Sequence, residues 1–170
     1  KALYMLGALD KVDTDKIAHS IMSYYKCYND TYGVFEDEWG WVHQTRAAIK
    51  ALYILGKLDI VPKDKLINSM VYVYDYATGG TIDESIDTLD TVITVLYHLN
   101  ALDVIDRNKT IDWILARQDP FQYGAFVFPP PDYPDSEGNL YGIECLYYLN
   151  ALGVLDEPFQ IRESPPPPPS

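Results

Sequence analysis

One phrase recurs four times along this 170-residue chain and constrains its fold more than any other feature. It reads ALYMLGALDKVD from Ala2, ALYILGKLDIVP from Ala51, VLYHLNALDVID from Val95 and CLYYLNALGVLD from Cys145. The central Leu-Gly or Leu-Asn step begins at Leu6, Leu55, Leu99 and Leu149, so successive copies lie 49, 44 and 50 residues apart. A period of this length is typical of proteins built from stacked supersecondary units.

Each copy predicts a pair of helices joined by a short turn. In the second copy, Ala48, Leu52 and Leu55 recur at a spacing of three to four residues, which is the period of an apolar helical stripe. We expect this helix to end near Leu58, after which Pro62 opens the next helix. No alternating apolar and polar pattern persists long enough to predict a β-strand. The sequence therefore predicts an all-α fold.

The boundaries of the other helices follow from the same register. Asp13 and Asp106 stand where an N-cap residue belongs in the sister copies. A loop with Gly and aromatic or acidic residues follows the second helix of each pair, and a Gly in it can end that helix by taking a positive φ. The next helices are expected to begin at residues 43–45, 90–91 and 139–141.

The third loop and the helix after it show the repeat most clearly, in ILARQDPFQYGAFVF and LYGIECLYYLNALG. A Gln-containing step at a helix end, a Gly-Phe type of loop and a helix ending in Leu-Gly resemble the repeat of prenyltransferases and squalene cyclases. The resemblance covers almost all of residues 1–157. It implies an αα-toroid, in which inner helices surround a cavity and outer helices wrap them, with residues 45–58, 91–102 and 141–152 as inner helices.

The chain holds about three and a half helical hairpins, fewer than the related enzymes use to close a ring. We therefore expect residues 1–157 to form an αα-toroid-like array that is incomplete as a ring. Residues 158–170 include SPPPPPS, and a run of Pro favours extended polyproline II and excludes a helix. We expect this segment to be a Pro-rich tail or linker, either a spacer or a ligand-like tail.

Three activities of the toroid families each need a motif that this sequence lacks. Terpene cyclases protonate an alkene with the middle Asp of Asp-x-Asp-Asp, and the segment DTLDT has Leu89 in that place. Prenyltransferases hold zinc with an Asp-x-Cys step, and Val92 stands where this Cys belongs. Neither Cys27 nor Cys145 lies in the Cys-Gly-Glu-Gln stretch of thioester-bearing toroids. We therefore assign no catalytic, cofactor-binding or metal-binding residue, and we expect Cys145 in the core.

Charge excludes some partners and leaves others open. The net charge of −12, from 25 Asp and Glu against 13 Lys and Arg, repels a polyanion and predicts that the chain does not bind nucleic acid. The acidic residues of the loops at 36–38, 83–87 and 132–137 have three possible roles. We rank a solvated surface first, weak Ca²⁺ binding second and a carboxylate pair for glycoside hydrolysis third. The longest apolar run, 92–105, is interrupted by polar residues and predicts no membrane span.

Aromatic residues in the loops have two interpretations. One group contains Tyr32, Phe35, Trp39 and Trp41, and a second contains Phe121, Tyr123, Phe126, Phe128 and Tyr133. These side chains wedge neighbouring hairpins together, or they form a stacking platform for a carbohydrate or an apolar ligand, with Trp39, Trp41, Phe126 and Phe128 as the candidates. We favour the wedge, because aromatic stripes in repeat proteins usually belong to the core.

The open ends of the array predict a protein partner or self-association. The first and last helices carry Leu3, Leu6, Leu149 and Leu152 on apolar faces without an outer helix to cover them.

The sequons at Asn29 and Asn108 become glycan acceptors if the protein is exported.

Together these features favour a non-catalytic binding or assembly module of an exported or cell-surface protein. An extracellular or cell-surface location is thus expected, and a cytoplasmic one stays open. The alternative function is a fragment of a prenyltransferase- or terpene-cyclase-like enzyme whose catalytic residues lie on repeats outside this chain.

Overall fold

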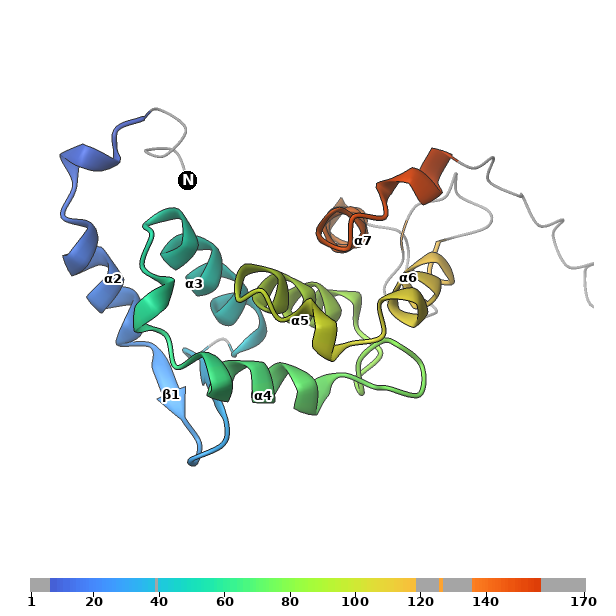
Figure 1. Ribbon diagram of the computed structural model, residues 1–170, viewed down its shortest axis with the longest axis horizontal. Coiled ribbons are helices and arrows are strands. Elements are labelled where there is room, and N and C mark those ends of the chain that lie inside the picture. The colour runs from blue at the N-terminus through green and yellow to red at the C-terminus, as the bar shows by residue number, and fades with distance from the viewer. Residues whose placement is uncertain (1–6, 39, 119–125, 127–135, 157–170) are drawn as a thin grey trace, which may run out of the picture.

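The computed structural model describes residues 7–38, 40–118, 126 and 136–156, and the fold of these residues is mostly helical (Figure 1). They form six α-helices: α2 (Thr14–Met22), α3 (Val42–Ile54), α4 (Lys63–Val73), α5 (Ile86–His98), α6 (Arg107–Leu115) and α7 (Ser136–Tyr148). Four short 3-10 helices accompany them: η1 (Leu9–Lys11), η2 (Leu58–Ile60), η3 (Leu102–Val104) and η4 (Leu152–Asp156). Two strands, β1 (Tyr25–Cys27) and β2 (Gly33–Phe35), pair antiparallel.

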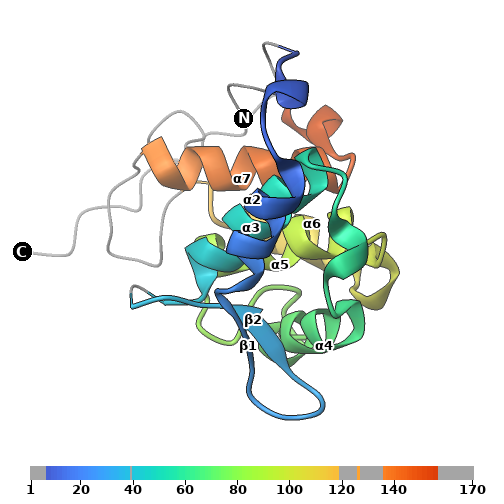
Figure 2. The ribbon, with the colours of Figure 1, turned by 90° about the vertical axis from the view of Figure 1, so that its left-hand side faces the viewer.

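Three helices form a central row, in which α3 packs on α5 and α5 packs on α7. The flanking helices lie outside this row, with α2 against α3, α4 against α5 and α6 against α7 (Figure 1). Ten of the thirteen residues of α5 are buried, because this helix packs against α3, α4 and α7. Figure 2 shows the β1–β2 pair beside α4, which it contacts through β2.

The repeated sequence contains the turn that ends each helix of the central row. The residue after the repeated Leu has a positive φ in every copy: Gly7 63°, Gly56 67°, Asn100 56° and Asn150 51°. The next backbone N–H then bonds the carbonyl five residues back, over 2.8 Å in each case: Lys57 to Leu52, Ala101 to Leu96 and Ala151 to Leu146. This is the closing bond of a Schellman cap. The cap needs one residue with a positive φ, a conformation that Gly and Asn tolerate best.

The row helices begin and end earlier than the sequence predicts. The predicted ranges are 45–58, 91–102 and 141–152, whereas the helices occupy 42–54, 86–98 and 136–148. The prediction of an end near Leu58 is wrong because Gly56 stops the α-helix first, and Leu58 instead opens the separate 3-10 turn η2. α5 begins before residue 90 because the Ser85 side chain caps it, accepting from the backbone N–H of Thr88.

The predicted starts of the flanking helices are confirmed. The Asp13 carboxylate accepts a hydrogen bond of 3.0 Å from the Lys16 N–H, and Asp106 accepts one of 3.1 Å from the Lys109 N–H. Pro62 directly precedes α4. Its fixed φ suits a helix start, so the second copy begins its helix without a side-chain cap.

The β1–β2 pair corrects the all-α prediction. Each strand has three residues, which is too short for an alternating pattern to be visible in the sequence. Asn29 sets the turn between them, because its Oδ1 accepts from the backbone N–H of Thr31 over 2.7 Å and of Tyr32 over 2.9 Å. Side-chain bonds of this kind replace the backbone bonds of a turn.

The same pairing recurs in shortened form after the other flanking helices. Tyr25 pairs with Phe35, Tyr74 bridges Thr81, and Gln118 bridges Phe126. The first residues of these pairs lie 49 and 44 residues apart, as do the first three copies of the repeated Leu. Each unit thus returns to the central row through one antiparallel contact.

Candidate binding site

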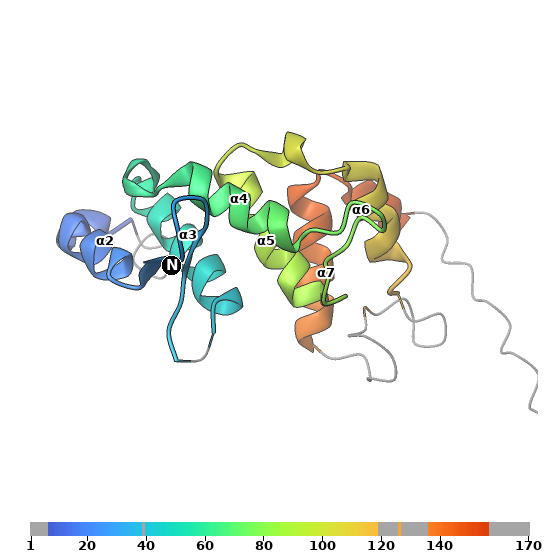
Figure 3. The same cartoon turned by 90° about the horizontal axis from the view of Figure 1, so that it is seen from below.

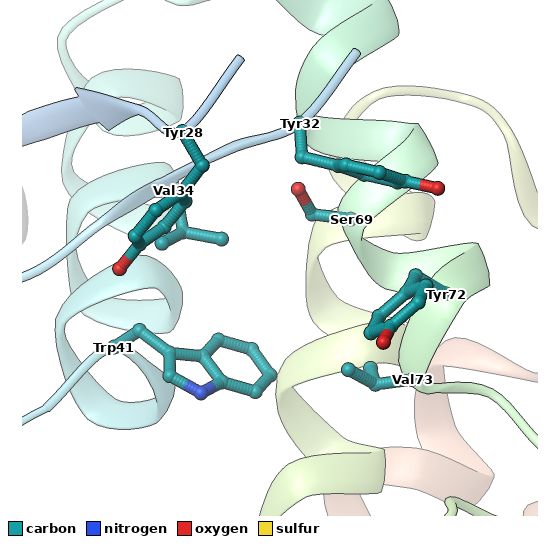
Figure 4. A pocket seen from close by; sticks show the side chains of 7 residues that line it. All are labelled: Tyr28, Tyr32, Val34, Trp41, Ser69, Tyr72 and Val73. Atoms are coloured by element: carbon teal, nitrogen blue, oxygen red, sulfur yellow. The ribbon is translucent and has the colours of Figure 1, made fainter.

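A groove lined by aromatic side chains opens beside the β1–β2 pair (Figure 4). It encloses about 370 Å³ and is lined by Tyr28, Tyr32, Val34, Trp41, Ser69, Tyr72 and Val73, and we call this surface the aromatic groove. Figure 4 shows Tyr28 and Trp41 facing Tyr32 and Tyr72 across the space between them. The walls are therefore largely aromatic side chains.

The four rings come from three segments of the chain. Tyr28 and Tyr32 flank the turn between the strands, and the Tyr28 N–H donates to the Tyr32 carbonyl over 3.1 Å. Trp41 directly precedes α3, and Tyr72 stands on α4 with 66% of its surface exposed. The Tyr32 and Tyr72 rings are in contact, with centroids 5.4 Å apart and planes tilted by 57°.

The floor of the aromatic groove is apolar and its polar groups are already bonded. The Ser69 hydroxyl lies 3.0 Å from both the N–H and the carbonyl of Gly33, which ties β2 to α4. On the rim, the Tyr28 hydroxyl donates to the Glu36 carboxylate, and this bond raises the pKa of Tyr28. A ligand here would meet apolar surface below and aromatic polar groups at the edges.

The sequence singled out four loop aromatics, and the structure separates them. Trp41 lines the aromatic groove. Phe126 is only 3% exposed and packs on α7, where a Cβ added to Gly142 would lie 2.5 Å from the Phe126 ring. Phe126 therefore has the wedge position, whereas Trp41 is partly buried against the core and also lines the aromatic groove. Trp39 and Phe128 lie outside the described residues.

The sequence analysis missed two rings of the aromatic groove, namely those of Tyr28 and Tyr72. Tyr28 lies four residues before Tyr32, which the sequence does group with Trp41, so its place in the same loop was a usable signal. Tyr72 carries no such signal, because it is one apolar residue among many on α4. Only the packing of α4 against β2 brings it to Tyr28 and Tyr32.

A second cluster of polar side chains joins the three row helices. The Arg46 guanidinium on α3 donates to Asp87 over 2.9 Å and to Asp90 over 2.6 Å, both on α5. It also lies 4.4 Å above the Tyr141 ring centroid of α7 and 3.3 Å from the hydroxyl of that side chain. His43 approaches Asp87 at 3.5 Å. We call these five residues the arginine cluster.

Burial governs the electrostatics of the arginine cluster. Asp90 is fully buried, and burial raises its pKa to about 6 although the Arg46 charge opposes the shift. The Cys145 thiol lies 3.9 Å from the Asp90 carboxylate, and burial raises the pKa of this thiol well above its ordinary value. The thiol is therefore protonated near neutral pH, donates weakly to Asp90 and lacks the thiolate character of a nucleophile. Its predicted place in the core is confirmed.

The face that carries the arginine cluster continues along the row helices. Lys50 and Glu144 pair over 2.6 Å between α3 and α7. Farther along, the His98 ring contacts the Tyr53 and Tyr148 rings, with centroids 4.5 and 5.6 Å away. Neither His98 nitrogen has a hydrogen-bond partner within the described part of the chain, and burial lowers its pKa. This imidazole is therefore neutral at pH 7.

Acidic residues of the loops are engaged in local turns. Asp75 accepts from the Ala77 N–H over 2.9 Å, and Asp83 accepts from the Thr88 hydroxyl over 2.7 Å. No group of three or more His, Cys, Asp or Glu side chains is placed to hold a metal ion among the residues that the structure describes. Weak Ca²⁺ binding by these loops stays a prediction.

The residues proposed for self-association and glycosylation fall in different environments. Leu3 and Leu6 lie outside the described residues, Leu149 is buried at 2% exposure, and Leu152 is 40% exposed. A free apolar face at the end of the array is therefore visible at Leu152 and not at Leu149. Asn29 and Asn108 are both exposed. Of the described helices, none is long and apolar enough to cross a membrane.

No protein-family model matches this chain, and no curated protein matches it significantly in sequence. The resemblance to prenyltransferase and squalene-cyclase repeats is therefore carried by the repeat alone.

Proposed function

We propose that this protein is a non-catalytic binding module and that its ligand occupies the aromatic groove. The observation that carries the proposal is the convergence of Tyr28, Tyr32, Trp41 and Tyr72 on one hollow with an apolar floor. Tyr28 and Tyr72 remain 60% and 66% exposed, so their rings are not used to close the core. Concave aromatic surfaces with a few polar groups at the edge are typical ligand sites.

The groove is held in shape without a ligand. The Asn29 side chain bonds two backbone N–H groups of the turn that carries Tyr28 and Tyr32. Ser69 ties the following strand to the helix that carries Tyr72. A preformed site loses little conformational freedom on binding, which raises its affinity for a given contact area.

The toroid-like arrangement is part of the same proposal. We infer that α3, α5 and α7 are the inner helices of an incomplete αα-toroid and that α2, α4 and α6 are the outer ones. Their alternation along the chain and the common turn at each repeated Leu support this inference. In such an array the arginine cluster ties neighbouring inner helices together, and export of the protein stays an expectation from the sequence.

Binding can be tested with three soluble probes on the 170-residue chain. Cellohexaose, chitohexaose and a capped peptide with the sequence of residues 164–170 are titrated by isothermal calorimetry. We expect at least one probe to bind, and the variant Tyr72→Ser to weaken it about tenfold or more. Tyr53→Ser is the matched control, because Tyr53 is 56% exposed and lies on α3 away from the groove. If none of the three probes binds at about 1 mM, the proposal is wrong. Any affinity weaker than this corresponds to a binding free energy of less than about 4 kcal/mol, which is too little for a functional site.

A further inference from the structure

We infer that the aromatic groove binds a polyproline segment, and that its occupant is the proline run of residues 164–170 from a second copy of this chain. This inference rests on the proposed function and names the ligand of the same site. The run SPPPPPS is in the sequence, and a run of five prolines favours stiff polyproline II, which would be roughly 15 Å long. Such segments dock in aromatic-lined grooves in several unrelated domains.

The hydrogen-bonding groups of the aromatic groove match those of a proline run. Proline has no N–H, so the run offers carbonyl acceptors and apolar ring faces only. The groove offers aromatic faces together with three donors, the hydroxyls of Tyr32 and Tyr72 and the indole N–H of Trp41. None of these donors has a hydrogen bond within the described residues, and each is free to meet a carbonyl.

A carbohydrate fits these groups less well. Its hydroxyls are donors that need acceptors, and the Glu36 carboxylate already accepts from Tyr28 and lies 3.6 Å from the Lys26 ammonium. Ser69, the polar side chain of the floor, is bonded to Gly33. A sugar hydroxyl would therefore depend on the Tyr32 and Tyr72 hydroxyl oxygens as acceptors, whereas a proline run has no donor to satisfy.

Strand addition is also disfavoured, which separates proline from other extended peptides. An added strand needs a free backbone edge on the protein. Here β2 is paired with β1 on one side, and the N–H and carbonyl of Gly33 are engaged by Ser69 on the other. A proline run needs no such edge, because most of its binding comes from ring contacts.

The position of the last described element points to a second copy. The chain is described as far as η4, which follows α7. Figures 1 and 3 show α7 and α6 toward one end of the molecule, and α2 with the β1–β2 pair toward the other. We assign the tail of one copy to the groove of the next, in a head-to-tail contact. Because each copy carries a net charge of −12, added salt should strengthen the contact by screening repulsion.

The test compares the full chain with a variant in which Pro165 to Pro169 are all replaced by Ser, which leaves the groove without its proposed occupant. The capped peptide of residues 164–170 is titrated into this variant, and cellohexaose is titrated in parallel. We expect the peptide to bind, Tyr72→Ser to weaken it about tenfold or more, and Tyr53→Ser to leave it unchanged. Circular dichroism of each variant confirms that the fold is retained.

Sedimentation velocity then tests the second copy. The average mass of the wild-type chain should rise with protein concentration and with salt, while the mass of the Ser variant should not. Binding of cellohexaose but not of the peptide would overturn this inference and leave the proposed function standing, whereas binding of neither would remove both. Peptide binding with equal, concentration-independent masses of the two chains would overturn the assignment to a second copy.

Discussion

Arg46 on α3 and Asp90 on α5 form an ion pair with 2.6 Å between Nη1 and Oδ2, and Asp90 is fully buried. The two residues occupy the same position of adjacent repeats, nine residues before Leu55 and Leu99 respectively. Equivalent positions of two neighbouring repeats therefore carry opposite charges and form an ion pair with each other. Tyr141 of the next unit covers the guanidinium, so three successive units are joined here.

Removal of the Arg46 charge should destabilise the protein strongly. Arg46→Met leaves Asp90 buried without its cation, and we expect a loss of about 3–5 kcal/mol in the free energy of unfolding. Urea unfolding monitored by circular dichroism measures this loss. Lys16→Met is the control, because Lys16 pairs with Asp13 at the surface, where such pairs contribute little. Equal effects of the two substitutions would contradict a special role for the buried pair.

Asp90 should make stability depend on pH in a direction opposite to that of most carboxylates. Its pKa is about 6 in the folded protein and about 4 in the unfolded chain, so the folded state binds the proton more tightly. The contribution of Asp90 to stability is therefore full below pH 4 and is lost as the pH rises through 6. The measurement is the free energy of unfolding of wild type minus that of Asp90→Asn at several pH values. This difference should fall from pH 4 to pH 7, and a rise over this range would show that the pKa is lowered instead.

At the positive-φ residue that follows each repeated Leu, the effect of a substitution on stability should depend on whether the new residue tolerates positive φ, and not on its side-chain chemistry. Asn100 has a φ of 56°, so Asn100→Ala should cost about 1–2 kcal/mol of stability and Asn100→Gly should be nearly neutral. Thermal unfolding of the two variants separates these outcomes. Asn108→Ala in α6 serves as a control, because Asn108 is exposed and outside the positive-φ residues. If Asn100→Gly is as damaging as Asn100→Ala, the side chain of Asn100 matters and this account of the repeat is wrong.

Gly142 should resist substitution although it lies inside a helix. Gly142→Ala would raise helix propensity, but its Cβ would lie 2.5 Å from the Phe126 ring, and we expect a net loss of about 1–3 kcal/mol. Adding Phe126→Leu to Gly142→Ala should recover part of this loss by making room for the methyl group. Chemical unfolding of both variants and of Phe126→Leu alone completes the cycle. An additive result would place the two residues out of contact.

Local structure could be predicted from the sequence alone, because it depends on residues that are close along the chain. The repeated Leu-Gly and Leu-Asn steps located the helix ends within a few residues, and Asp13 and Asp106 marked the helix starts. The misplacement of the ends by about four residues arose where apolar periodicity continued through Gly56 into Leu58, beyond the point at which the backbone turns left-handed.

Contacts between residues far apart in the chain could not be predicted from the sequence and are visible only in the folded structure. Tyr28 and Tyr72 lie in different units, and their common groove depends on the three-residue strand β2 resting on α4, a contact for which no short-range pattern exists. The same is true of Arg46 and Asp90, whose equal repeat positions are visible in the sequence while their burial is not. The burial of Asp90 depends on the packing of α3, α5 and α7 together, and this burial raises the Asp90 pKa.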